Sequence, residues 1–430
     1  MPAWRRGECP TLQRPMPTGD GLLARLRPVD NILTLPQLRA LAIAAQRFGN
    51  GIVEITARGS LQIRGLKPET VAPFEDAVLQ AGIRISTGVG IETPPLAGLD
   101  TDELIDVRPI AGELRLKIAA HRPELILAPK LAITLDGGGR FHLAHVSADI
   151  KITAFRDGDL TKFLLAVGGT NKSARPVAIV DEVEMVDTLI GLLEKLAAMG
   201  PEARGKDIDL QAIAAPRLNL HEPPLVGLVH HDILGIAFAH RQADAASLIA
   251  FAGAAEALGA GDVRLAPCHG FFVTGLSAGE AGQLQRFATT LGFLTEPADP
   301  RRNIALCAGS RGCASAFYDT RDLAARIMAQ APDLLDGSFD VHLSGCPKGC
   351  AHPAPSVLTL VGARAGYGLV VNGAASKAPA TYIADNDINT ALLRLQALVR
   401  QSKEDGESVS ACLTRLGAGE IAAALRMDGT

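Results

Sequence analysis

The sequence has few aromatic residues and no marked excess of charge of either sign. Aromatic residues make up 4% of its 430 residues, and 42 basic residues against 46 acidic ones give a formal net charge of −4. Proteins that hold nucleic acid by bulk charge or base stacking need a basic surface or many aromatic rings. We therefore expect no nucleic-acid partner.

A long hydrophobic run is also missing. No stretch reaches the length of about 18 apolar residues that a membrane-spanning helix needs. The basic segment Met1–Arg6 is not followed by the apolar core of a signal peptide. We therefore expect no membrane segment and no secretion. The hydrophobic fraction of 47% is typical of a globular protein with a sizeable core, and we expect it to be cytoplasmic.

Cysteine is scarce, and its spacing is informative. Seven cysteines are too few, and odd in number, for a disulfide scaffold, so metal or redox chemistry is favoured. Four of them form two close pairs in glycine-rich segments. Cys307 and Cys313 have C-x5-C spacing, and Cys346 and Cys350 have C-x3-C spacing. The other three, expected to be packed or exposed thiols, are Cys9, Cys268 and Cys412.

The two cysteine pairs predict a [4Fe–4S] site. Four thiolates on two loops match the ligand number of the cluster, and glycine lets backbone amides approach sulfur. Three other interpretations stay open. Zinc sites usually have closer cysteine pairs than C-x5-C, and disulfides would need an oxidising compartment. Four inert cysteines would pack as small hydrophobic residues.

The chain also repeats itself. Each copy combines an alternating strand, an alanine-rich amphipathic helix and a pair of strands, which is half of a ferredoxin-like unit. These segments are 21–27, 36–48 and 51–66 in the first copy and 235–241, 247–258 and 261–276 in the second. A duplication with a pseudo-two-fold axis explains the repeat.

Segments further along each copy match in the same order. Ala144-His145, which precedes Asp149, matches Ala351-His352, which precedes Ser356, at an offset of 207 residues. Val167 matches Val371 at an offset of 204 residues, and the helix expected at 183–198 matches the one expected at 387–401. All four paired cysteines lie in the second half. The first half is therefore free to contribute basic side chains to a shared site.

The predicted fold class is α+β, with two similar halves. Each half is expected to hold a ferredoxin-like half-domain and a larger α/β domain, and only the second α/β domain carries the cluster cysteines. The expected ranges are 15–85, 90–205, 225–298 and 300–425.

These motifs resemble the nitrite and sulfite reductase superfamily over about residues 15–400. Its members are pseudo-symmetric duplications that hold a [4Fe–4S] cluster beside a sirohaem. The resemblance implies that the cluster ligands are Cys307, Cys313, Cys346 and Cys350. In members that bind sirohaem, the cysteine matching Cys350 bridges the cluster to the haem iron.

Two strands resemble the tetrapyrrole-binding strands of that superfamily. The first carries Arg25 and Arg27, which alternation places on one face, and the second carries Arg58 and Gln62. Arginine binds a carboxylate through two parallel hydrogen bonds. With Lys130, these residues are the candidate ligands of the tetrapyrrole carboxylates. Two further arginines beside glycine turns are Arg64 and Arg311.

Segments 6–23, 94–108 and 130–139 resemble one branch of the superfamily, the precorrin-3B synthases of aerobic cobalamin synthesis. Sulfite reductases carry an arginine where segment 89–98 has none, and two lysines where segment 127–132 has only Lys130. Those basic groups bind and protonate a small anion. Their loss weakens the prediction of anion reduction.

This branch implies a monooxygenase-type oxidoreductase with precorrin-3A and O2 as substrates. An oxygen atom enters the C20 carbon, an acetate side chain closes a γ-lactone, and a separate reductase supplies electrons through the cluster. The branch is associated with a mononuclear non-haem iron. His142, His145 and Asp149 would suit such an iron, although His145 also fits a structural role.

Two alternatives stay open. One is a sirohaem-dependent assimilatory sulfite or nitrite reductase, which alone of the three hypotheses requires bound sirohaem. The other is an electron-transfer or scaffold protein that holds a cluster without catalysis. Intrinsic sirohaem absorption would favour the reductase, and oxygen-dependent conversion of precorrin-3A would exclude the scaffold.

Overall fold

The computed structural model describes residues 10–216, 218, 220, 225–230, 232–267, 269–352 and 354–426. Cys9 and Cys268 lie outside these ranges, so their predicted roles stay untested. The chain forms two compact units. The first contains the residues up to Pro17, Leu22–Ala237 and Asp244–Leu291; the second contains Thr18–Gly21, Phe238–Ala243 and the chain from Gly292 onward.

The first ferredoxin-like half-domain lies in the first unit. Its helix α1 (Leu35–Phe48) begins where Thr34 and Gln37 each accept a hydrogen bond from the other's backbone amide, and Pro36 occupies the first turn. The other elements are β1 (Met16–Thr18), β2 (Gly21–Leu26), β3 (Ile32–Thr34), β4 (Ile52–Ile55), β5 (Leu61–Leu66) and α2 (Val71–Gln80).

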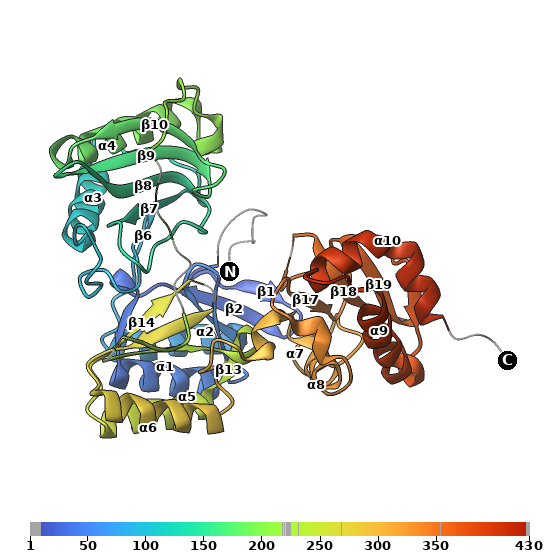
Figure 1. Cartoon of the computed structure of the whole chain (residues 1–430). Helices are drawn as coiled ribbons and strands as arrows, with labels where there is room; N and C mark the ends of the chain where they lie inside the picture. Colours follow the sequence, from blue (N-terminus) through green and yellow to red (C-terminus); the bar gives the residue numbers. More distant parts are fainter. Residues whose placement is uncertain are drawn as a thin grey trace. The chain divides into compact units, whose positions relative to one another are not determined.

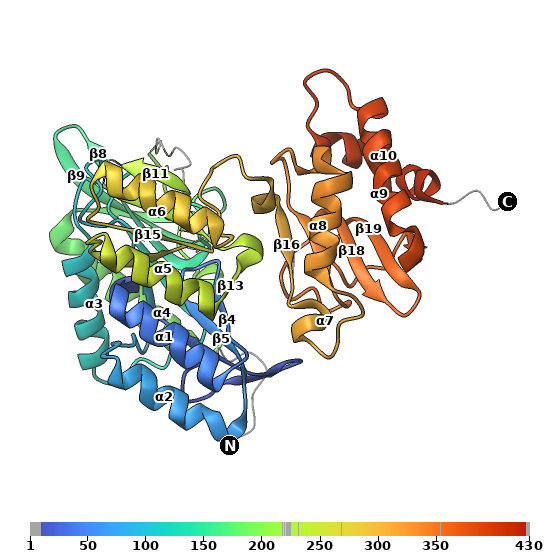
Figure 2. The ribbon, with the colours of Figure 1, turned by 90° about the horizontal axis from the view of Figure 1, so that it is seen from below.

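The second half-domain repeats this order. Its elements are β11 (Gly227–His230), β12 (Ile233–Ala237), β13 (Gln242–Asp244), α5 (Ala245–Ala257), β14 (Asp262–Ala266), β15 (Gly270–Val273) and α6 (Ala278–Thr290). The predicted β-α-β-β order is therefore present in both copies. Figure 2 shows α1, α5 and α6 side by side.

The two half-domains exchange a strand. β3 belongs to the first copy, yet it pairs antiparallel with β14 and completes the sheet β11-β12-β15-β14-β3. In return, the backbone amide of Ala245 donates to the carbonyl of Gly51 at 2.8 Å. The half-domains are thus joined by backbone hydrogen bonds as well as by helix packing.

The strand predicted at 235–241 ends earlier, at Ala237. His240 and Arg241 follow in a short turn with φ of 58° and 66°, a left-handed conformation that a strand cannot contain. Asp30 and Asn31 have the same conformation in the first copy, with φ of 57° and 59°. The turn is therefore part of the repeat.

The first α/β domain contains the sheet β10-β9-β8-β7-β6, with β6, β7 and β8 parallel and the remaining pairs antiparallel. Helices α3 and α4 pack on one face, where Ile133, Ile152 and Leu189 are among the core residues (Figure 1). The elements are β6 (Gly90–Glu92), α3 (Arg108–Ala120), β7 (Ala132–Asp136), β8 (Ala148–Asp157), β9 (Leu160–Gly169), β10 (Arg175–Val180) and α4 (Glu182–Met199).

The second unit contains a sheet of the same design, β16-β17-β18-β19-β20. Its first three strands are parallel and its last two pairs antiparallel, as in the first α/β domain. The elements are β16 (Ile304–Leu306), α7 (Gly309–Gly312), α8 (Thr320–Gln330), β17 (Val341–Ser344), β18 (Ser356–Ala363), β19 (Gly366–Gly373), β20 (Thr381–Ile383), α9 (Ile388–Ser402) and α10 (Val409–Leu425).

The strand registers correct one predicted offset. Both ladders pair residues 17 apart (151 − 134 and 359 − 342), and matching the strand ends Asp136 and Ser344 gives a shift of 344 − 136 = 208 residues. The predicted offset of 207 is odd, and an odd shift would match core residues with residues of the opposite face. The offset of 204 between Val167 and Val371 agrees with the register.

Among the described residues, no helix combines the length and the apolar character that crossing a membrane requires.

Candidate functional site

The second unit brings the four paired cysteines to neighbouring loops. Cys307 follows β16, and Cys313 follows the short helix α7. Cys346 and Cys350 lie in the segment between β17 and β18, where Cys346 is buried and Cys350 reaches solvent. All four are free thiols, which removes the disulfide interpretation for them. Cys412 is a buried thiol on α10, apart from these loops, as expected of a packed residue.

The surroundings of the four thiols fit an iron–sulfur cluster. Burial raises the pKa of the Cys350 thiol, and negative charge on Cys346 and Cys307 raises it further. Neighbouring thiolates repel one another unless a cationic group lies between them. The backbone amide of Gly345 already donates to the sulfur of Cys307 at 3.2 Å. The four thiols are not placed to share a single metal ion such as zinc, but four thiolates on neighbouring loops match the ligand number of the larger [4Fe–4S] cluster.

A tight turn that belongs to the second unit closes over one of these loops. The backbone amide of Ala314 donates to the carbonyl of Gly19 at 3.1 Å. A Cβ atom at Gly19 would collide with the sulfur of Cys313. A larger residue at this point would therefore displace either the turn or the sulfur of a candidate ligand.

Two predicted tetrapyrrole ligands lie together on a polar face of the first half-domain. Arg25 donates through Nε and Nη2 to Gln62 Oε1, at 3.1 and 2.5 Å. Gln62 Nε2 donates to Glu54, which also pairs with Arg64 at 3.4 Å. The opposite face of these strands is core, where Val53 is fully buried. The network holds both arginines in place before any ligand arrives.

The other predicted ligands have different surroundings. Arg27 forms a 2.7 Å ion pair with Glu92, whose side chain is only 7% exposed, so Arg27 joins the half-domain to the α/β domain. Arg58 donates to the carbonyl of Ser147 at 2.8 Å. The side chain of Lys130 is exposed. Arg311, in the second unit, pairs with Asp319.

Asp149 does not suit the proposed mononuclear iron set. Its two oxygens accept hydrogen bonds from Arg204 and from the amides of Ala132 and Gly205. Arg204 holds the pKa of this carboxyl below its usual range, although burial opposes the shift. Within the described ranges, no three His, Cys, Asp or Glu side chains are placed to share one metal ion. The interpretation of His142, His145 and Asp149 as ligands is therefore wrong for Asp149.

A large cavity in the first unit was not predicted from the sequence. It has a volume of about 580 Å³ and lies on the face of the first α/β sheet that α3 and α4 leave open. Lys151 and Thr153 of β8, Leu164 of β9, and His142 and His145 of the preceding loop line it. The lysine stands between two isoleucines, a pattern that predicts an exposed side chain, so no local pattern in the sequence signals this cavity.

Lys151 is a buried cation in the wall of this cavity. The whole residue is only 2% exposed to solvent. Its Nζ donates hydrogen bonds to Thr134 Oγ1 and to the backbone carbonyls of Leu143 and Val146. Burial lowers the pKa of Lys151 to about 8, while the charge of Asp136 acts in the opposite direction. At neutral pH the ammonium form therefore prevails.

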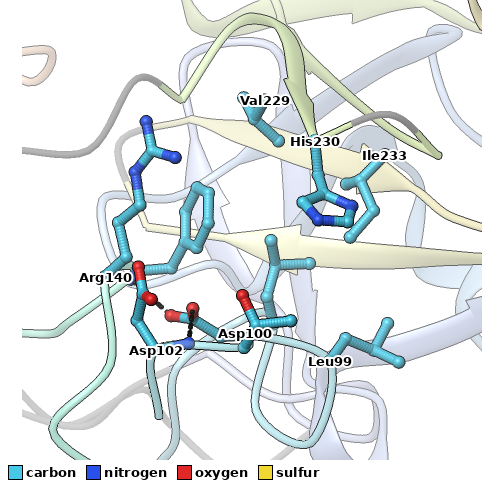
Figure 3. A pocket seen from close by; sticks show the side chains of 10 residues that line it. Leu99, Asp100, Asp102, Arg140, Val229, His230 and Ile233 are labelled. Carbon is cyan, nitrogen blue, oxygen red and sulfur yellow. Dashed lines mark hydrogen bonds between the residues drawn. The ribbon is translucent and has the colours of Figure 1, made fainter.

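Figure 3 shows a second, much smaller pocket in the first unit. Its volume is about 30 Å³, enough for a water molecule but not for a substrate. The side chains of Arg140 and His230 border it, and Asp100 accepts a hydrogen bond from the amide of Asp102 at 3.1 Å. Phe141 lines this pocket and belongs to an apolar cluster that also includes Phe272.

Comparison with known proteins identifies related sequences along nearly the whole chain. A precorrin-3B synthase from Sinorhizobium sp is 50% identical over 434 aligned positions, which cover 98% of this chain and 94% of that protein. A ferredoxin–nitrite reductase from Synechococcus elongatus is 27% identical and covers 82% of this chain and 78% of its own length. Residues 14–81 match the model of the nitrite/sulfite reductase ferredoxin-like half domain.

A solved structure shares the fold. The NirA protein of Mycobacterium tuberculosis superimposes with a TM-score of 0.69 and covers 93% of this chain and 84% of its own, at 16% identity. The predicted α+β architecture of the nitrite and sulfite reductases is thereby confirmed.

Proposed function

The chain belongs to the precorrin-3B synthases, and from that premise we propose that it is a cytoplasmic oxidoreductase that converts precorrin-3A in aerobic cobalamin synthesis. One oxygen atom of O2 is inserted at the C20 carbon of the macrocycle, and an acetate side chain closes a γ-lactone. The observation that carries this proposal is the 50% identity to a synthase across almost the whole of both chains.

The number of the cysteines and their position on neighbouring loops support a [4Fe–4S] cluster in the second unit. Cys307, Cys313, Cys346 and Cys350 would hold it, and such a cluster supplies single electrons when it is bound. The electrons come from a separate reductase in this proposal, because the sequence has no glycine-rich dinucleotide fingerprint.

The polar face of the first half-domain supports binding of the macrocycle carboxylates. Gln62 and Glu54 fix the orientation of Arg25 and Arg64, so little side-chain entropy is lost when a carboxylate binds. Arg58 lies in the turn between β4 and β5, where its guanidinium is tethered through one nitrogen to Ser147. Arg27 and Lys130 complete the predicted set; the pairing of Arg27 with Glu92 favours a positioning role for it.

A mononuclear iron is the part of the expectation that the described residues fit least. Asp149 forms an ion pair with Arg204, and His142 and His145 lie on the loop beside the large cavity. We therefore derive no step of the reaction through such an iron.

The runner-up is a sirohaem-dependent nitrite or sulfite reductase. Relatives of that activity match at 27% identity or less. Segment 89–98 has no arginine, and segment 127–132 keeps one lysine, Lys130, where sulfite reductases have two. The synthase is therefore the better-supported function.

One experiment tests the proposal. The purified protein is analysed for iron, sulfide and absorption, and then incubated with precorrin-3A, a reductant and isotopically labelled O2. We expect cluster absorption without intrinsic sirohaem bands, and one labelled oxygen atom in the product. Sirohaem bands together with nitrite or sulfite reduction would establish the reductase instead.

A further inference from the structure

A histidine is buried beneath the cluster loop (345–355) of the second unit. In β17, Val341 and Leu343 belong to the core that also includes residues of α8 and α9, so His342 between them faces the other side of the sheet. Thr359 is its partner in β18 and faces the same side, because both of its neighbours in the strand are core residues. A polar pair therefore lies on the face of the sheet that the two helices leave open.

The polar edge of the His342 ring is turned toward the cluster loop. A Cβ atom at Gly349 would lie 3.8 Å from Cε1 of His342 and 3.1 Å from Cβ of Ala375. Cε1 is the carbon between the two ring nitrogens, so Nδ1 and Nε2 lie on either side of this contact. Gly349 directly precedes Cys350 and has a left-handed φ of 61°. The imidazole nitrogens are thus close to a turn that carries a candidate cluster ligand.

Neither nitrogen of this ring has a partner in the part of the chain that the structure describes. His342 is 0% exposed, and Nδ1, Nε2 and the hydroxyl of the adjacent Thr359 all lack hydrogen bonds there. Buried polar groups are almost always hydrogen-bonded, since burying them without a partner destabilises the fold. Three unpartnered polar atoms in one place point to a partner other than the protein chain itself.

His342 offers one uncharged donor to a loop that is held in place. Burial lowers the pKa of His342 to about 4, and the charges of His352 and Arg241 act in the same direction. At neutral pH the imidazole therefore carries a single N–H. Arg241 donates to the carbonyl of Ala351 at 2.8 Å and pairs with Asp340 at 2.9 Å, which fixes the chain directly after Cys350.

We infer that His342 donates its N–H to a sulfur atom of the cluster that Cys346 and Cys350 would help to hold, and thereby raises the reduction potential of the cluster. This inference rests on the proposed function, which supplies the cluster. Reduction adds one electron to a centre already surrounded by four thiolates, and an N–H directed at sulfur favours the more negative state. The predicted role of His342 is to make the cluster easier to reduce.

The test is a redox titration of the full-length, cluster-containing protein at fixed pH, followed by electron paramagnetic resonance. His342→Phe keeps an aromatic ring and removes the N–H, whereas His342→Gln keeps an N–H donor. We expect His342→Phe to lower the equilibrium constant for reduction about tenfold, which is about 59 mV for one electron. His342→Gln should lie between His342→Phe and the wild type.

A matched control is available in the same unit. The ring of His240 also has a buried nitrogen, Nδ1, without a partner among the described residues. The charges that act on His240 are those of Arg321, Arg301 and Asp299, none of which belongs to the cluster loop. His240→Phe should therefore leave the reduction potential unchanged. Circular dichroism with iron and sulfide analysis establishes that each variant is folded and loaded.

The outcomes separate this inference from the proposed function. A wild-type reduction potential in fully loaded His342→Phe would overturn the inference alone. Loss of the cluster from His342→Phe but not from His342→Gln would support it, because only the N–H distinguishes the two in this respect. Loss from both variants would show a structural role and overturn it. A wild-type protein without iron and sulfide would refute the cluster of the proposed function, and the inference with it.

Discussion

In each of the two α/β domains, a corresponding loop follows the corresponding strand of a five-stranded sheet. Different side-chain interactions hold the two loops in place. The first loop (137–147) follows β7, and the cluster loop (345–355) follows β17. By register, Asp136 corresponds to Ser344 and Lys151 to Thr359. Two charged residues of the first domain are thus replaced by two hydroxyl residues in the second.

The buried charges hold the first loop from inside the protein. Asp136 accepts the amide of Leu143 at 2.6 Å, and Lys151 donates to the carbonyls of Leu143 and Val146. In the cluster loop, Ser344 donates to the carbonyl of Cys346 at 2.7 Å. Thr359 Oγ1 is buried and makes no hydrogen bond in the part of the chain that the structure describes.

This difference shows that the same arrangement of strands can hold a loop in two ways, by buried charged side chains or by a bound group. A loop that is tied by its own protein's charges is complete without a ligand, whereas a loop with free thiols depends on what the thiols bind. The two loops should therefore respond oppositely to loss of the cluster and to loss of the charges.

The largest expected effect comes from Cys346→Ala. With three thiolates left, we expect nearly all iron and sulfide to be lost, because a [4Fe–4S] cluster is held by four. Hydrogen exchange should then rise in the cluster loop and stay unchanged in the first loop. Cys412→Ala is the control and should keep its iron. Full iron content in Cys346→Ala would contradict the ligand assignment.

Gly19→Ala should have the next largest effect. The added Cβ would collide with the sulfur of Cys313, so the turn or the ligand loop must move. We expect a several-fold loss of bound iron after purification, while the fold persists. Gly279 of α6 has open space at the Cβ position, and Gly279→Ala should leave the iron content unchanged. Equal iron content in the two variants would remove the proposed role of the turn.

The charge of Lys151 makes the first loop sensitive to pH. Burial lowers its pKa to about 8 from 10.5, with Arg58 adding to the shift and Asp136 opposing it. The folded state therefore releases this proton before the unfolded state does, so folding is favoured as the pH rises through that interval. Relative to Lys151→Met, the wild type should gain about 3 kcal/mol of unfolding free energy.

Urea unfolding of both proteins, at pH values below and above this window, measures the gain. Groups other than Lys151 titrate in both proteins, and their contributions cancel in the difference. If the unfolding free energy of the wild type relative to Lys151→Met fell with rising pH, the folded state would favour the charged form of Lys151, which would contradict the prediction.

The smallest effects come from single substitutions at the corresponding strand ends. Asp136→Asn leaves the amide of Leu143 or Gly138 poorly matched and should cost about 2 kcal/mol of unfolding free energy. Ser344→Ala removes one neutral hydrogen bond and should cost about 1 kcal/mol. Thermal or urea unfolding of the two variants gives the comparison. A larger cost for Ser344→Ala would reverse the assignment of which loop depends on side chains.

The sequence predicted those features that short-range patterns carry. Cysteine spacing identified the four thiols that the fold brings to neighbouring loops, and alternation with helical periodicity identified both half-domains. The strand at 235–241 was too long because nothing in the local pattern reveals the left-handed turn at His240. The offset of 207 was wrong by one residue. Similar residue types in two segments do not reveal which face of the sheet each side chain occupies.

Lys151 escaped prediction for a different reason. Its burial comes from the loop 137–147, whose carbonyls fold back over the sheet. The sequence around it, an alternating strand with one lysine, is typical of a half-exposed strand. Its position opposite Thr134 follows from the pairing of β7 with β8 and from no local signal.

The exchange of β3 has a consequence for how this molecule could have arisen. A chain with a single copy of the repeat would have to supply its own β3 to another sheet and receive one in return. Such a protomer could complete its sheet only in an isologous dimer. The present chain therefore has the connectivity of two swapped subunits made continuous by gene fusion. After fusion, the two copies could diverge in sequence. The second copy now carries the four paired cysteines, and the first carries the buried Asp136 and Lys151.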